Sequence, residues 1–235
     1  MTRFPVLDAR LAACADMVTG GFVCDIGTDH AYLPSFLVRT GRCERAIAAD
    51  INAAPLEAAR HTLAAEGTAD RVQTVLSDGL KDVCLDGVTD IVFAGMGGEL
   101  IARLITEDSR IDGSIAVITQ PMTRHEYLRR TLTETGFDPE EERAVCSSGR
   151  CYTVMRWRFT GNRRVCDELF AYTGLLDGSR RDDLMYIEQL DARLMKAAKG
   201  MEKSRPDKAA EIFKLAAEIR DKAGYELFPH ADFLS

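Results

Sequence analysis

The chain of 235 residues lacks several features that would assign it to other classes of protein. No apolar run approaches the roughly 20 residues that a membrane-spanning helix needs, so we expect no association with a membrane. Its seven cysteines are odd in number, include no Cys-x-x-Cys pair and lie mostly in apolar stretches. They predict buried thiols in a reducing cytoplasm, with neither a disulfide framework nor a metal site.

Positive charge is also scarce, because the formal net charge is −7. A general nucleic-acid binder gains most of its affinity by neutralising phosphates, so this charge balance disfavours that class. Bases nevertheless outnumber acids in two stretches: residues 123–164 hold nine arginines against six acids, and residues 193–208 hold six bases against two acids. These stretches predict local basic surface on an acidic protein.

The Gly-x-Gly-x-x-Gly motif of dinucleotide-binding proteins is missing as well. The apolar run 22–26 instead ends in an Asp-x-Gly turn at Asp25 and Gly27, followed by Thr28 and Asp29. The turn would let backbone approach a ligand, while its acids would repel a pyrophosphate. A cationic ligand without phosphate, such as S-adenosyl-L-methionine, fits this loop, although a capped turn before a helix has the same residues.

Short apolar runs alternate with stretches of helical periodicity, which predicts repeated βα units and a doubly wound α/β sheet. The expected strands are 22–26, 46–49, 72–76, 90–94 and 114–119, and the expected helices are 7–18, 31–39, 53–65, 99–105 and 125–135. Residues 139–145 and 151–159 flank a Ser-Ser-Gly turn and predict an antiparallel hairpin at the sheet edge. A sheet that ends in such a hairpin is typical of class I (Rossmann-like) methyltransferases.

Beyond residue 161 the pattern becomes helical. Apolar residues recur at intervals of three and four over 184–201 and 209–219, which predicts an antiparallel coiled-coil hairpin. We therefore predict two domains, a cofactor-binding domain over residues 1–160 and a helical hairpin domain over 161–235.

Acids follow the second and third expected strands, at the edge where parallel strands form a ligand crevice. Asp50, beside Ile51, lies about 20 residues beyond the glycine turn, where an acid accepts hydrogen bonds from a ribose. Asp78, before Gly79, is placed to accept from the exocyclic amine of an adenine. A helix cap and an Asp-Gly turn are the alternatives. Together with the first loop, these acids predict an adenosine-containing cofactor.

A glycine-rich run follows the fourth expected strand. Three glycines there are costly unless the backbone comes close to a ligand. We expect Gly95, Met96 and Gly97 to line the cofactor site and Gly98 to shape the substrate pocket. A structural turn that needs one glycine is the alternative.

Two more pairs of residues are candidates for recognising a target base. After the fifth strand, the amide of Gln120 beside the rigid Pro121 is suited to reading the edge of a base, although a strand terminator would look the same. At the mouth of the crevice, His30 and Tyr32 are placed to stack on a base, although single rings there are often surface fillers.

With these residues in view, the chain resembles the TrmK family, bacterial tRNA adenine-N1 methyltransferases that act on position 22. The similarity covers nearly the whole chain, including a C-terminal helical hairpin. The motifs that carry it are Leu7-x-x-Arg10-Leu11, Asp25-Ile26-Gly27-Thr28-Asp29-His30-Ala31-Tyr32-Leu33-Pro34, Ser77-Asp78-Gly79-Leu80, Ala94-Gly95-Met96-Gly97-Gly98-Glu99-Leu100-Ile101 and Gln120-Pro121.

The resemblance implies a methyltransferase that uses S-adenosyl-L-methionine and binds tRNA. It places Asp29 near the transferring methyl group, with His30 and Tyr32 holding the adenine. Contacts to tRNA phosphates are expected from the helical hairpin and from Arg124, Arg129 and Arg130. We expect a monomer or weak homodimer. The alternative is a methyltransferase of a small molecule or protein in which the hairpin serves oligomerisation.

Overall fold

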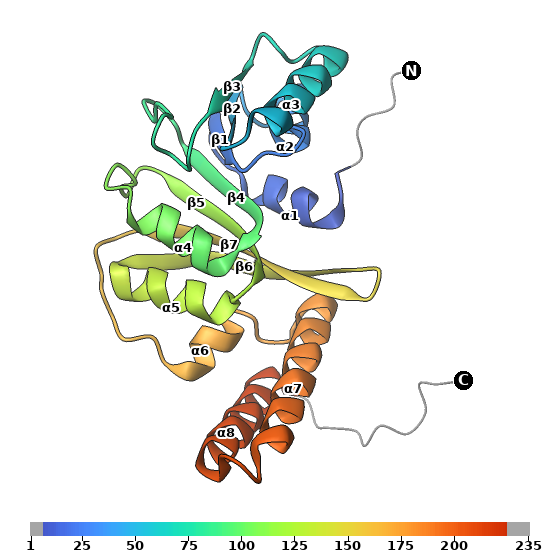
Figure 1. Cartoon of the computed structure of the whole chain (residues 1–235), viewed down its shortest axis with the longest axis vertical. Coiled ribbons are helices and arrows are strands. Elements are labelled where there is room, and N and C mark those ends of the chain that lie inside the picture. Colours follow the sequence, from blue (N-terminus) through green and yellow to red (C-terminus); the bar gives the residue numbers. More distant parts are fainter. Residues whose placement is uncertain (1–6, 225–235) are drawn as a thin grey trace.

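The structure is a computed structural model that describes residues 7–224. Its centre is a seven-stranded sheet with the strand order β3-β2-β1-β4-β5-β7-β6 (Figure 1). The strands are β1 (Phe22–Ile26), β2 (Arg45–Asp50), β3 (Val72–Leu76), β4 (Asp90–Gly97), β5 (Ala116–Thr123), β6 (Phe137–Ser147) and β7 (Arg150–Phe159). Strands β1 to β5 pair in parallel, whereas β7 is antiparallel to both β5 and β6. The predicted methyltransferase fold with its terminal hairpin is therefore confirmed.

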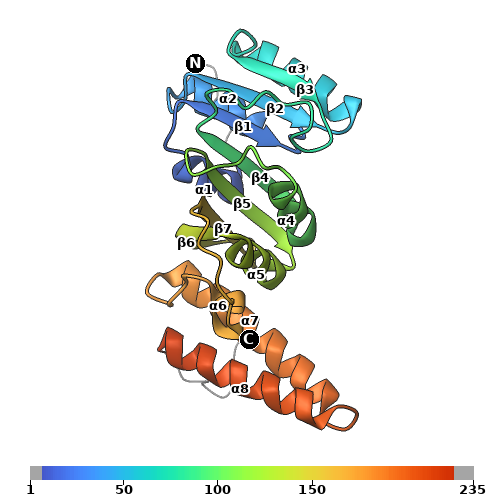
Figure 2. The same cartoon turned by 90° about the vertical axis from the view of Figure 1, so that its left-hand side faces the viewer.

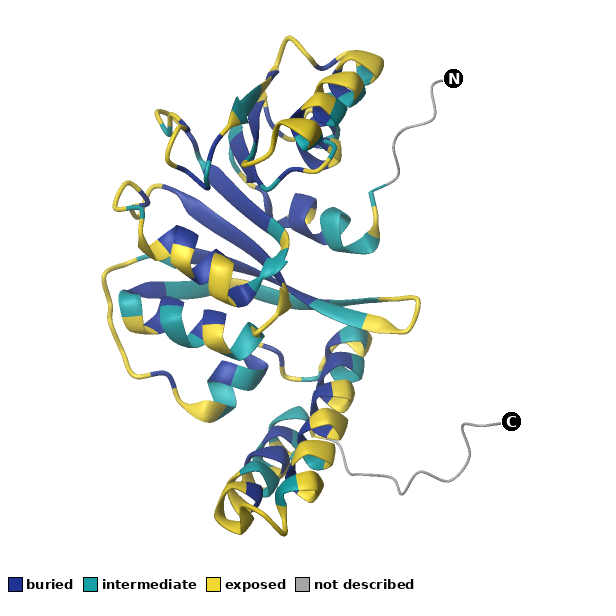
Figure 3. Cartoon of the chain, viewed as in Figure 1, coloured by how far each residue is buried: buried dark blue, intermediate teal, exposed yellow. Residues whose placement is uncertain are grey.

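Helices cover both faces of the sheet because its central strands are apolar on both sides (Figure 3). One face packs against α1 (Ala9–Met17), α2 (Tyr32–Arg39) and α3 (Ala53–Glu66), and the other against α4 (Gly98–Thr106) and α5 (His125–Thr135). Neighbouring residues of one strand alternate between the two cores: Val92 belongs to the first, and Phe93 to the second.

The C-terminal part adds a short helix, α6 (Glu168–Thr173), and a hairpin of two long helices, α7 (Arg181–Met201) and α8 (Pro206–Ala223). These long helices lie beyond the β6 edge of the sheet and extend the molecule at one end (Figure 2). They share a third core with Ala144 of β6, so the hairpin is packed against the sheet domain. Pro206, which interrupts the apolar pattern, is the first residue of α8. The outer ends of both predicted domains, 1–6 and 225–235, lie outside the described residues.

Two expectations from the sequence need correction. Strands β4 and β5 continue beyond their predicted ends, because pairing persists from Ala94 with Gln120 to Gly97 with Thr123 across an irregular register. The cysteines are not all free thiols: the register of β6 and β7 sets Cys146 directly opposite Cys151, and the two form a disulfide. None of the helices within residues 7–224 combines the length and apolar character that crossing a membrane requires.

Candidate active site

Loops from the carboxyl ends of three strands meet at one place on the sheet. After β1, the backbone N–H groups of Gly27 and Thr28 both donate to the carbonyl of Ala49 in β2, at 2.8 and 3.0 Å. Gly27 has a φ of +77°, and any side chain there would collide with the methyl end of Met96 from β4. The topology therefore brings together the predicted loops after β1, β2 and β4, as the crevice of an open α/β sheet requires.

Acids dominate this crevice. Asp25 is 6% exposed and bonded to the Thr28 side chain. Burial, against the opposing effect of the Thr28 hydrogen bond and with a smaller contribution from the negative charge of Asp50, raises the pKa of its carboxyl to about 6. Asp50 accepts one bond, from the backbone N–H of Asn52 at 2.7 Å. Asp78, after β3, pairs with Lys81, which lowers the pKa of the Asp78 carboxyl.

The chemistry of these groups fits an adenosine with a positive charge and no phosphate. Within residues 7–224 the buried carboxylate of Asp25 forms no ion pair with a cationic side chain, and the acid Asp50 lies near it. The side chain of Ile51 follows Asp50 directly and is 60% exposed. S-adenosyl-L-methionine fits these groups, since its positive charge suits a buried carboxylate, its ribose hydroxyls suit Asp50, and Ile51 offers an apolar surface beside them.

The three predicted catalytic residues lie together on the loop after β1. His30 and Tyr32 have stacked rings, with centroids 5.2 Å apart and planes inclined by 24°. The Asp29 side chain is 81% exposed, and its Oδ2 is 3.4 Å from His30 Nε2. Between the two rings, Ala31 adopts a φ of +53°, a costly conformation for a residue with a side chain. The structure thus presents an acid and two rings to solvent at the edge of the crevice.

The glycine-rich run uses its glycines for two different purposes. Gly95 needs its positive φ of +80°, and its N–H donates to Gln120 Oε1 at 3.1 Å. Gly98 starts α4 and is buried against the carbonyl oxygen of Arg124, where a side chain would collide with backbone. The run therefore holds the end of β4 against the loop that follows β5.

The role predicted for Gln120 and Pro121 is wrong. Because β5 continues through them, both are buried, and the Gln120 amide is fully used inside the protein. Its Oε1 also accepts from Arg10 Nη1 at 2.7 Å, and its Nε2 donates to the Pro121 carbonyl at 3.0 Å. Gln120 positions the Gly95 loop and presents no edge to a base.

Two of the three arginines predicted to bind phosphate are engaged elsewhere. Arg129 is fully buried, 2.6 Å from the Glu142 carboxylate, and it donates to two carbonyls at the end of α6. Arg130 pairs with Glu168 of α6 at 2.8 Å. Both hold α6 against α5. The prediction for Arg129 is wrong because its side chain is fully buried, whereas the side chain of Arg130 is one third exposed and its contact with phosphate stays a prediction. Arg124 is exposed beside the crevice and pairs with Glu99 at 2.9 Å.

Arg10 is a site residue that sequence reasoning assigned no role. Besides holding Gln120, its guanidinium lies over the ring of Tyr152, 5.6 Å from the centroid, and approaches the sulfur of Met122. Its only sequence signal is the Leu7-x-x-Arg10-Leu11 motif, because nothing in α1 itself indicates that this side chain reaches β5 and β7.

Comparisons with known proteins agree with this geometry. Residues 7–155 match the model of a methyltransferase domain family. The chain is 30% identical over 174 residues to the tRNA (adenine(22)-N(1))-methyltransferase of Bacillus subtilis strain 168, covering 73% of each protein. A structure of Sp1610 from Streptococcus pneumoniae in complex with S-adenosyl-L-methionine superimposes with a TM-score of 0.77 at 26% identity, over 93% of this chain and 100% of that one. The B. subtilis TrmK crystal structure shares the fold, with a TM-score of 0.80 at 21% identity over 94% and 100% of the chains.

Proposed function

The chain belongs to the family of tRNA (adenine(22)-N(1))-methyltransferases, and on this premise we propose that it methylates N1 of adenine 22 in bacterial tRNA. The observation that carries the proposal is the acid-lined crevice with the stacked pair His30 and Tyr32 at its edge. The crevice suits a cationic adenosine, and the exposed rings suit a base. The reaction takes place in the cytoplasm, where tRNA is found.

The cofactor is held by the residues that follow β1, β2, β3 and β4. Bound S-adenosyl-L-methionine supplies a methyl group on a positively charged sulfur. Asp25 faces the cationic part of the ligand, Asp50 accepts from the ribose hydroxyls, and Asp78 accepts from the adenine amine. The backbone from Gly27 to Thr28 and from Gly95 to Gly97 allows the close approach that these contacts need.

The target adenine would enter where the rings of His30 and Tyr32 are exposed, next to the cofactor site. N1 of adenine carries a free lone pair, so no residue has to remove a proton before transfer. His30 and Tyr32 hold the base by stacking, and Asp29 lies beside the base and stabilises the positive charge that passes to its ring. Alignment of the two reacting atoms is the larger contribution. Because position 22 lies within the folded tRNA, the base is turned out of its stack to enter.

The work of the chain is divided between the two segments predicted from the sequence. Residues 1–160 bind the cofactor and carry the reacting groups, and residues 161–235 hold the body of the tRNA.

The direct test is methyl transfer from labelled S-adenosyl-L-methionine to unmodified tRNA transcripts, with the product located by nuclease digestion and mass spectrometry. We expect 1-methyladenosine at position 22, and no product with a transcript that carries guanine there. Asp29→Ala should lower kcat with little change in cofactor affinity. Cofactor binding without transfer to any tRNA would contradict the proposal and favour a small-molecule or protein substrate.

A further inference from the structure

A pocket of about 480 Å³ opens between the tip of the β6–β7 hairpin and helix α7, apart from the cofactor crevice. One wall comes from β7 and its turn, with Arg150 and Tyr152, and the other from α7, with Tyr186, Gln189 and Arg193. The pocket therefore lies between the sheet domain and the helical hairpin.

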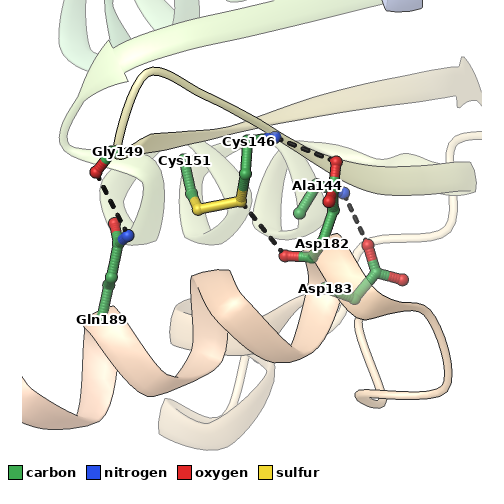
Figure 4. Close-up of a disulfide and its surroundings, with 7 residues drawn as sticks. All are labelled: Ala144, Cys146, Gly149, Cys151, Asp182, Asp183 and Gln189. Atoms are coloured by element: carbon green, nitrogen blue, oxygen red, sulfur yellow. Dashed lines mark hydrogen bonds between the residues drawn. A yellow bond between two sulfur atoms is a disulfide. The ribbon is translucent and has the colours of Figure 1, made fainter. Parts of the chain in front are cut away.

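The walls of this pocket are tied together by several contacts (Figure 4). The backbone N–H of Ala144 donates to the Asp183 carboxylate at 2.7 Å, and that of Cys146 donates to Asp182 at 3.0 Å. Gln189 Nε2 reaches the carbonyl of Gly149 at 3.4 Å. The first residues of α7 thus hold the hairpin in place, and contacts within the protein set the separation of the two walls.

The charge of the pocket is positive and unneutralised. Arg150 and Arg193 are exposed, and within residues 7–224 neither forms an ion pair. No acidic side chain is among the described residues that line the pocket. His125, on its floor, has its pKa lowered to about 3 by burial and by the nearby Arg129 and Arg193, so it is neutral.

These two arginines differ from most others in the chain. Of the nine arginines in residues 123–164, seven are paired with a carboxylate of the protein. Ion pairs within the protein therefore neutralise most of the positive charge in this stretch. Arg150 belongs to the remainder, and α7 brings Arg193 to the opposite wall. Two guanidinium groups around one concave space are suited to the oxygens of a phosphate.

The pocket is connected to the candidate active site through Arg10. Met122 and Tyr152 both line the pocket, and both contact the Arg10 guanidinium, which in turn bonds to the Gln120 amide that holds Gly95. This chain of contacts joins the pocket to the Gly95 loop, so a strand whose target base enters at that loop would have its neighbouring nucleotides near the pocket. The half-buried ring of Tyr152 offers a surface to a sugar or base, which an acidic peptide would not need.

We infer that this pocket binds a backbone phosphate of the RNA strand next to the methylated adenine, with Arg150 and Arg193 holding it from opposite walls. The inference rests on the proposed function for the identity of the strand. Because the two arginines belong to β7 and α7, the bound phosphate requires the sheet domain and the helical hairpin in their observed arrangement.

The test measures tRNA binding directly, without cofactor, for Arg150→Gln, Arg193→Gln and the double variant. The matched control is Arg163→Gln, which removes an exposed arginine that forms no ion pair within residues 7–224 and lies in the linker after β7. We expect each pocket variant to weaken binding about tenfold and to reduce the slope of log K against log salt by about one. The control should bind as the wild type does, and cofactor affinity should stay unchanged in all four.

Binding by the pocket variants with the wild-type constant and salt slope would overturn the inference. So would equal competition by a polyglutamate peptide and a short RNA, which would assign the pocket to an acidic protein segment. Failure of the wild type to methylate tRNA would contradict the proposed function alone, because the binding measurement does not depend on transfer.

Discussion

The cofactor crevice and the pocket between the β6–β7 hairpin and α7 have opposite charge, although they lie on the same molecule. The crevice gathers Asp25 and Asp50 from adjacent parallel strands, and Asp25 titrates near neutrality because it is buried. The pocket gathers Arg150 and Arg193 from two elements that are distant in the sequence. A protein with a net charge of −7 can thus receive a cation at one place and a polyanion at another, because most other arginines are neutralised internally.

The largest expected effect concerns an arginine that the structure uses for folding. Arg129→Met leaves the Glu142 carboxylate buried without its partner and removes donors from two carbonyls of the α6 end. We expect the free energy of unfolding in urea to fall by about 3–5 kcal/mol. The exposed pair of Arg103 with Glu107 provides the control, because Arg103→Ala should cost less than about 1 kcal/mol. An Arg129→Met protein with unchanged stability and weakened tRNA binding would return Arg129 to the phosphate-binding role.

The next effect tests whether the acids of the cofactor crevice contribute to cofactor affinity. Asp50→Ala removes the acceptor expected for the ribose hydroxyls, and we expect the affinity for S-adenosyl-L-methionine, measured by calorimetry, to fall about 30-fold, or about 2 kcal/mol. Asp70→Ala removes the same charge from an exposed position before β3, at the amino end of the parallel strands and opposite to Asp50, and should leave the affinity unchanged. Equal losses in the two variants would mean that only the overall charge matters.

The disulfide is expected to stabilise the β6–β7 hairpin, which forms one wall of the pocket that holds Arg150 and Arg193. It closes a loop with a sequence separation of five between Cys146 and Cys151. Replacing both cysteines by serine should lower the free energy of unfolding by about 2 kcal/mol or less, because so short a loop restrains little of the unfolded chain. The Cys84→Ser variant, at an exposed free cysteine, serves as a control for the substitution itself, and dithiothreitol should destabilise the wild type but not the double variant. A double variant as stable as the wild type would show that backbone pairing alone maintains the hairpin.

The smallest effect is a dependence on pH. Since burial raises the pKa of Asp25 from 3.8 to about 6, the carboxyl loses its charge as the pH falls below 6. Cofactor affinity should then fall about tenfold between pH 7 and pH 5, and Asp25→Asn should bind weakly without this dependence. A wild-type affinity that stays constant over that range would mean that Asp25 does not contact the cationic part of the cofactor.

The same group affects stability with the opposite sign. A folded pKa above the unfolded value means that the contribution of Asp25 is fully present below about pH 4 and is lost as the pH rises through 6. Asp25→Asn should therefore be more stable than the wild type at pH 8 in the absence of cofactor. Thermal unfolding of both proteins at pH 5 and pH 8 measures this difference.

Local patterns predicted most of the fold. The run Val72–Leu76 predicted β3 with its observed bounds, because it is rich in β-branched residues. Helical spacing located α5, because only one face of that helix is buried. The same patterns missed the true ends of β4 and β5, since strand pairing continues through glycine and proline when a neighbouring strand supplies the partners. Cys146 and Cys151 were missed because only the hairpin register sets them opposite each other.

The sequence by itself determined the cofactor side of this protein, because Asp25, Gly27 and Asp50 lie at the carboxyl ends of strands, and parallel strands bring such ends together whatever the rest of the chain does. Only the tertiary structure decided which arginines form ion pairs within the protein and which remain exposed. Arg129 and Arg150 look alike in the sequence, yet one is buried against Glu142 and the other faces a pocket. Whether a charged side chain meets a partner depends on contacts between residues far apart in the chain, and those contacts exist only once the fold has formed.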